Sequence, residues 1–182
     1  MNRLITIVLA LVLTLGAHAQ DEHMTFVGIP INGTIDQFQQ KLISKGFTVN
    51  KDINKYLPKG TRAFEGTFMG KKSEIAIYYD TKTNIVYSAK AMYSELTAES
   101  VDETYDYIQK NLKEKYKPGV NNSEEKIEKG LKTFTLLTES GQIILWQTKN
   151  DDSILSNIYT LHLQYRDYNN GIKHEQNNLD DL

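Results

Sequence analysis

One pattern occurs twice along this chain: a helix-like segment followed by three strand-like runs. This repetition restricts the folds that the chain can adopt. In the first helix-like segment, Ile35, Phe38 and Leu42 recur at the spacing of a single helical face. Thr34 stands before them with Gln37 three residues later, which is the capping-box pattern of a helix start. The sequence therefore predicts an amphipathic helix that begins just after Thr34.

The second helix-like segment is longer and follows Thr97, a residue suited to cap it. Its apolar residues are spaced by three and four positions: Val101, Tyr105, Ile108, Leu112 and Tyr116. Pro118 and Gly119 follow directly and are typical of a helix end. We expect one continuous helix with a single buried face between Thr97 and Pro118.

Three runs rich in β-branched and aromatic residues follow each helix-like segment. The runs cover about 63–69, 73–79 and 85–93 in the first set, and about 131–138, 142–148 and 154–165 in the second. Short polar links join neighbouring runs, which indicates antiparallel hairpins. Apolar and polar side chains alternate along most runs, so each has one side suited to burial.

The alternation also predicts how the layers stack. Tyr87, Ala89 and Ala91, for example, lie on one side of their run. The apolar sides of the runs need a cover, and the two helices can supply it on one face of a sheet. The expected fold is a two-layer α+β domain. In it, tandem α-β-β-β repeats, at about 24–93 and 97–166, form one antiparallel sheet with the helices on one face.

The first 19 residues have the pattern of a secretory signal peptide. Arg3 supplies a positive start, residues 4–17 are almost wholly apolar, and Ala17-His18-Ala19 is a small-x-small cleavage site. We expect cleavage after Ala19 and export of the protein to the periplasm or the outside of the cell.

The rest of the chain has the length of one domain. We place this single α+β domain at 20–166 and expect a flexible tail at 167–182, which is rich in Asn and Asp and lacks periodicity. The formal net charge of the whole chain is −2, so no basic field exists for a nucleic acid. The chain has no cysteine, which excludes disulfides, thiol catalysis and a Cys-linked lipid anchor.

One segment has a familiar pattern. Residues 26–38 read FVGIPINGTIDQF, and Gly66-Thr67-Phe68-Met69-Gly70 fits a G-x-F-x-G motif. Together they resemble the uncharacterised exported proteins of Bacteroidetes bacteria. The repeated layout is also loosely similar to β-lactamase-inhibitor-like and PepSY-like domains. The resemblance implies an exported protein and assigns no activity and no functional residue.

Motifs for catalysis or metal binding do not occur in the sequence. The four histidines lack the spacing of a metal site or a catalytic triad, and there is no glycine-rich phosphate loop. We therefore predict no metal and no cofactor. The catalytic alternative is a hydrolase of an envelope polymer that uses paired carboxylates such as Asp102 or Glu125. Asp102, Glu103 and Asp106 equally fit a solvated face near a helix start.

Aromatic residues are the remaining signal, with eleven tyrosines, six phenylalanines and one tryptophan. Tyr78, Tyr107 and Trp146 each stand beside an apolar or aromatic neighbour that points the other way, so they are candidate contact residues. Two long loops, 50–62 and 117–130, are the usual place for binding. We expect a non-catalytic protein that binds a protein or a glycan of the cell envelope. A third hypothesis, which rests on fold analogy alone, is that the protein is an inhibitor or a chaperone-like module.

Overall fold

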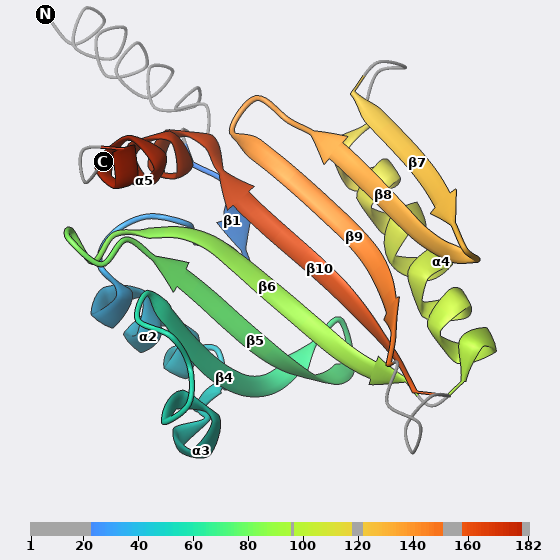
Figure 1. Ribbon diagram of the computed structural model, residues 1–182, viewed down its shortest axis with the longest axis horizontal. Helices are drawn as coiled ribbons and strands as arrows, with labels where there is room; N and C mark the ends of the chain where they lie inside the picture. The colour runs from blue at the N-terminus through green and yellow to red at the C-terminus, as the bar shows by residue number, and fades with distance from the viewer. Residues whose placement is uncertain (1–22, 96, 118–121, 151–157, 180–182) are drawn as a thin grey trace, which may run out of the picture.

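The computed structural model describes residues 23–95, 97–117, 122–150 and 158–179 (Figure 1). The expected signal peptide at 1–19, the Pro118-Gly119 pair and the first part of the 154–165 run lie outside the described residues. The architecture is α+β, with one large antiparallel sheet and helices packed against it, as the sequence predicts.

Eight strands form the main sheet: β3 (Thr48–Val49), β4 (Thr61–Phe68), β5 (Lys71–Tyr79), β6 (Val86–Glu95), β7 (Ser123–Glu128), β8 (Leu131–Leu137), β9 (Gly141–Lys149) and β10 (Tyr159–Asp167). Their order across the sheet is β3-β4-β5-β6-β10-β9-β8-β7, and every neighbouring pair is antiparallel. The two halves of the chain therefore meet where β6 pairs with β10, in the middle of the sheet (Figure 1).

Two helices cover one face of this sheet. Helix α2 (Ile35–Ser44) begins with the capping box of Thr34 and Gln37, as predicted, and buries Ile35, Phe38 and Leu42. Helix α4 (Ala98–Tyr116) is capped by the Thr97 side chain, which accepts the backbone N–H of Ser100. The buried faces of both helices belong to one hydrophobic core with the inward side chains of the strands. In Figure 1 both helices lie behind the sheet.

A small hairpin precedes α2 and closes one end of the core. Strands β1 (Thr25–Phe26) and β2 (Ile29–Pro30) are joined by Val27 and Gly28, which have φ angles of 48° and 75°. Two successive positive φ angles are those of a type I′ hairpin turn. The turn holds the Phe26 ring 5.0 Å from the Phe68 ring, measured between centroids, in the core.

Both long loops contain regular structure that the sequence analysis does not predict. Residues 51–54 form a short helix, α3 (Lys51–Asn54), capped by the Asn50 side chain. Residues 123–128 form β7, the edge strand beside β8. This strand is almost wholly exposed and reads SEEKIE, so its composition suggests a charged loop. Charged side chains on an edge strand are a common protection against pairing with other chains.

The expectation of a flexible tail at 167–182 is wrong for most of its length, because helix α5 spans Tyr168–Leu179. Asp167 is fully buried, and its carboxylate accepts the backbone N–H of Asn170, as an N-cap residue does. The Asn170 side chain donates to the carbonyl groups of Ile31 and Val86. These tertiary hydrogen bonds fix a helix whose sequence has little apolar periodicity, so the domain extends through α5.

The predicted face of Tyr87 is also wrong. Tyr79 pairs with Val86 and Tyr78 pairs with Ser88, so Tyr87 is an extra residue at a β-bulge. The bulge shifts the alternation by one position, and Val86 takes the buried place instead. Tyr87 then lies beside Tyr78, with 6.5 Å between the ring centroids.

Candidate functional site

The sheet face opposite α2 and α4, called the open face below, holds two of the three predicted contact residues. Their chain neighbours Ile77 and Leu145 are fully buried in the core, so Tyr78 on β5 and Trp146 on β9 point the other way. Lys90 on β6 stands between them. Its Nζ lies 5.6 Å from the centroid of the Tyr78 ring and 6.0 Å from that of the Trp146 ring. Both distances are typical of cation–π contacts.

His162 on β10 completes this group. It lies directly across from Trp146, and the two rings stack with 4.7 Å between centroids and 10° between planes. Its Nε2 is 2.9 Å from the hydroxyl of Thr148. Burial and the nearby charge of Lys90 lower the pKa of His162 to about 4, so the imidazole is neutral at pH 7. His162 therefore lies on the open face, beside Trp146.

Helix α5 borders the open face at one end. The His174 ring on α5 stacks on Tyr87, with 4.1 Å between centroids and 10° between planes. Arg166, at the end of β10, forms an ion pair with Glu175 on α5. The open face therefore carries a line of side chains that runs from Tyr87 through Tyr78 and Lys90 to Trp146, and the His174 ring of α5 adjoins its Tyr87 end.

Tyr107, the third predicted contact residue, lies elsewhere. It is on α4, the helix that covers the core face of the sheet, and 56% of its surface is exposed. The sheet separates it from Tyr78 and Trp146, so the structure does not bring the three residues together.

The carboxylates of the hydrolase alternative fasten α4 to the sheet. Asp102 accepts a hydrogen bond from the Gln147 side chain at 2.6 Å and lies 3.4 Å from Lys132 Nζ. Asp106 lies 3.0 Å from the same ammonium group. Glu125 accepts from the hydroxyl of Tyr105 at 3.4 Å, within an otherwise exposed edge strand. None of these three carboxylates lines the cavity described next.

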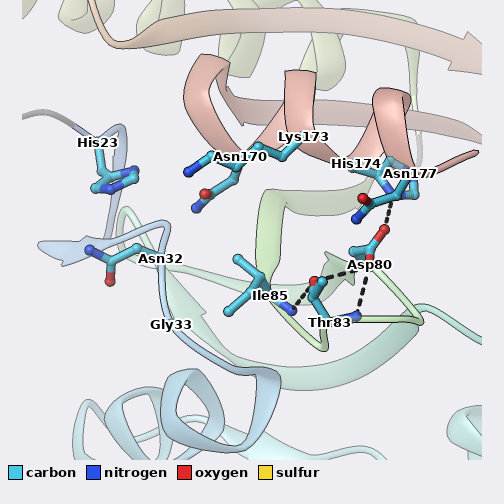
Figure 2. Close-up of a pocket in the computed structure, with 10 residues that line it drawn as sticks. All are labelled: His23, Asn32, Gly33, Asp80, Thr83, Ile85, Asn170, Lys173, His174 and Asn177. Atoms are coloured by element: carbon cyan, nitrogen blue, oxygen red, sulfur yellow. Dashed lines mark hydrogen bonds and ion pairs between the residues drawn. The ribbon is translucent and has the colours of Figure 1, made fainter.

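A second candidate site is a cavity of about 390 Å³ that the sequence analysis does not predict (Figure 2). It lies between α5, the turn that joins β5 to β6, and the segment before α2. Its polar lining residues include two histidines, an aspartate, a lysine and several asparagines: His23, His174, Asp80, Lys173, Asn32 and Asn177. Figure 2 shows His23 and Asn32 on one side, with Asp80, His174 and Asn177 on the other.

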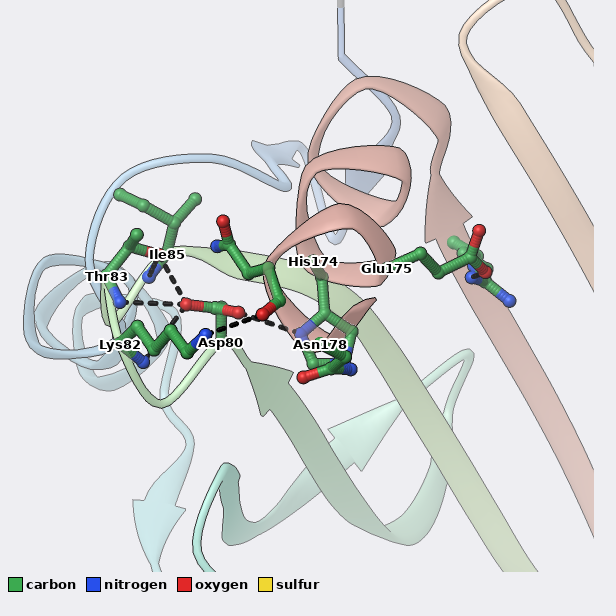
Figure 3. A network of polar contacts seen from close by, with 9 residues as sticks. Asp80, Lys82, Thr83, Ile85, His174, Glu175 and Asn178 are labelled. Atoms are coloured by element: carbon green, nitrogen blue, oxygen red, sulfur yellow. Dashed lines mark hydrogen bonds and ion pairs between the residues drawn. The ribbon is translucent and has the colours of Figure 1, made fainter. Parts of the chain in front are cut away.

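Two histidine–aspartate pairs hold the walls of this cavity together. His174 Nδ1 lies 2.9 Å from Asp80 Oδ2, and His23 Nδ1 lies 3.1 Å from Asp167 Oδ2. Both carboxylates are buried, and both imidazoles keep about a fifth of their surface exposed. Burial alone would raise the pKa of Asp80. Hydrogen bonds from His174 and from Thr83 outweigh that effect and hold the pKa well below the usual range (Figure 3).

Sequence reasoning misses this cavity because no local spacing marks it. His23 and Asp167 are 144 residues apart, and His174 belongs to the segment expected to be a tail. One signal was available: Asp167 closely follows the strand-like run at 154–165, and an Asp in such a place suits the N-cap of a helix.

Among residues 23–95, 97–117, 122–150 and 158–179, no group of three or more His, Cys, Asp or Glu side chains could hold a metal ion. No helix in the described residues is long and apolar enough to cross a membrane. Comparison with protein-family models, with curated proteins and with solved structures finds no match to this chain. The resemblance to exported Bacteroidetes proteins therefore stays a prediction.

Proposed function

We propose that this protein is a non-catalytic binding protein, exported to the cell envelope, that uses the open face to bind a protein or a glycan there. The single observation that carries the proposal is the arrangement of Tyr78, Lys90 and Trp146, which meet on a sheet face that α2 and α4 leave uncovered. Aromatic rings and a cation at the centre of a surface are typical of binding hot spots.

The charge of Lys90 supports this use of the face. Lys90 makes no ion pair with any residue that the structure describes, and its ammonium group contacts aromatic rings instead. His162 beside it is neutral at pH 7. The open face therefore presents a positive charge that is not neutralised by its surroundings, next to apolar rings. A partner that offers an acceptor for this charge and an apolar surface for the rings would satisfy both.

Export is part of the same proposal and rests on the leader at residues 1–19. Cell fractionation with an antibody against the protein, together with N-terminal sequencing, tests it. We expect the protein in the periplasmic or extracellular fraction, with Gln20 as its first residue. An intact leader on cytoplasmic protein would contradict the proposal.

Affinity capture tests the binding role. The purified protein is immobilised, native envelope extract is passed over it, and retained proteins and glycans are identified by mass spectrometry. Trp146→Ala and the double variant Tyr78→Ala, Trp146→Ala are compared with Tyr107→Ala, a matched removal of an exposed ring on the other side of the sheet. We expect a retained partner that the open-face variants lose and Tyr107→Ala keeps. Equal retention by all variants would place the binding surface elsewhere.

A further inference from the structure

We propose that the cavity beside α5 is a second binding site, separate from the open face, and that it binds a small organic molecule with one carboxylate group. The cavity lies in the size range of small-molecule sites. Its walls come from three segments that are far apart in the chain. Some polar groups of these walls are occupied within the fold, and others are free.

The two carboxylates at the cavity are fully used within the fold. Asp80 accepts the backbone N–H groups of Lys82 and Thr83 and the hydroxyl of Thr83, and it also pairs with His174. Asp167 accepts the backbone N–H groups of Met24 and Asn170 and pairs with His23. A buried carboxylate with this many donors needs no cation from a ligand.

The donors at the cavity are less fully used. Lys173 on α5 makes no hydrogen bond or ion pair with any described residue, and the same holds for the side-chain amide of Asn32. Figure 2 shows Lys173 on α5 above the cavity, with His23 and Asn32 on the neighbouring wall. An ammonium group and a side-chain amide are together suitable donors to an anion.

The charge count selects a carboxylate over a phosphate. Lys173 supplies one uncommitted positive charge, which a single carboxylate neutralises. A phosphate dianion would leave excess negative charge close to Asp80, whose low pKa keeps it ionised. Ile85 and Gly33 also line the cavity and provide room for an apolar body on the ligand. The ligand class is therefore a small organic monocarboxylate.

Titration of the ¹⁵N-labelled protein with butyrate, followed by NMR, tests this site. We expect saturable shifts at residues 23, 32 and 173, and binding about tenfold weaker in Lys173→Met, which removes the charge and keeps the length of the side chain. Lys41→Met, at an exposed position of α2, is the matched control and should bind as the wild type does. Asn32→Asp replaces the side-chain amide with a negatively charged carboxylate of the same size, and it should abolish binding.

Three results would overturn the proposal. Shifts that do not saturate, or that spread evenly over the surface, would show that there is no site. Equal affinity in Lys173→Met and the wild type would show that the anion is not held by this ammonium group. Tighter binding of inorganic phosphate than of butyrate would refute the monocarboxylate class. An unchanged melting temperature in Lys173→Met confirms that the variant is folded. The capture experiment on the open face does not depend on the outcome of any of these titrations.

Discussion

The open face and the cavity beside α5 are assembled in opposite ways. Tyr78, Lys90 and Trp146 come from strands of one sheet, where strand alternation alone decides which side each residue faces. The cavity takes residues from three segments that meet only because α5 is hydrogen-bonded in place. A surface of the first kind can be recognised from local periodicity, whereas a site of the second kind exists only after tertiary docking.

The cavity, unlike the open face, depends on the docking of α5. Asp167→Ala leaves the buried N–H groups of Met24 and Asn170 without an acceptor, which we expect to cost about 2–5 kcal/mol of unfolding free energy. Urea denaturation measures the loss, and hydrogen exchange should show α5 as the segment that opens first. Asp36→Ala, which removes an exposed carboxylate paired with Arg62, should cost less than about 1 kcal/mol. Equal losses in the two variants would contradict the role given to Asp167.

A smaller effect is expected at the other aspartate of the cavity. Asp80→Asn weakens the hydrogen bonds that join the β5–β6 turn to α5, at a cost of roughly 1.5–3 kcal/mol at pH 7. The folded state lowers the pKa of Asp80, so this stabilisation is present above its ordinary pKa of about 4 and is lost as the pH falls below that value. Denaturation curves at several pH values should therefore converge for the two proteins in acid. A constant difference at all pH values would argue against an ionised Asp80.

The open face should tolerate change better. Trp146 is half-buried and stacks on one side only against His162, so Trp146→Ala should cost about 1–2 kcal/mol and leave α5 in place. NMR signals of His174 and Asn170 report on α5, and they should not move. If they shift, the open face and the cavity are one coupled unit rather than two sites.

The smallest effect is a change in titration. Lys90→Met removes the charge near His162, so the pKa of His162 should rise from about 4 but stay below its ordinary value, because burial also lowers it. An NMR titration of the imidazole measures this. In the wild type, the neutral His162 contributes stability that is full above about pH 6.5 and is lost as the pH falls toward 4. An unchanged pKa in the variant would mean that Lys90 points away from the ring.

Much of the fold could be predicted because the responsible signals are local. The Thr34 and Thr97 caps, the apolar faces of two helices and the alternation of most strands are each encoded within a few residues. The parts that were missed depend on contacts between distant segments. Helix α5 is fixed by Asp167 and Asn170, and the place of Tyr87 depends on a bulge between two strands.

The candidate sites also differ in whether local signals or contacts between distant segments determine them. Alternation indicates that Tyr78 and Trp146 each point away from a buried neighbour. In the structure they share one face of the sheet, and Lys90, which the sequence analysis does not single out, lies between them. Tyr107 also has a neighbour that points inward. This pattern does not reveal on which side of the sheet its helix lies. The spacing of the histidines along the chain does not reveal the cavity, because the aspartate partners of His23 and His174 are far away in the sequence.

The order of the strands has a consequence for how the protein is made. β10 is the last strand in the described chain, yet it lies in the middle of the sheet between β6 and β9. Until it is available, the two halves of the sheet each present an unpaired inner edge, and unpaired edges attract other chains. A chain delivered from its N-terminus can therefore complete its fold only after almost all of it has emerged. Pairing over such long sequence separations is slow, so the inner edges of β6 and β9 stay unpaired for longer than the edges within each hairpin.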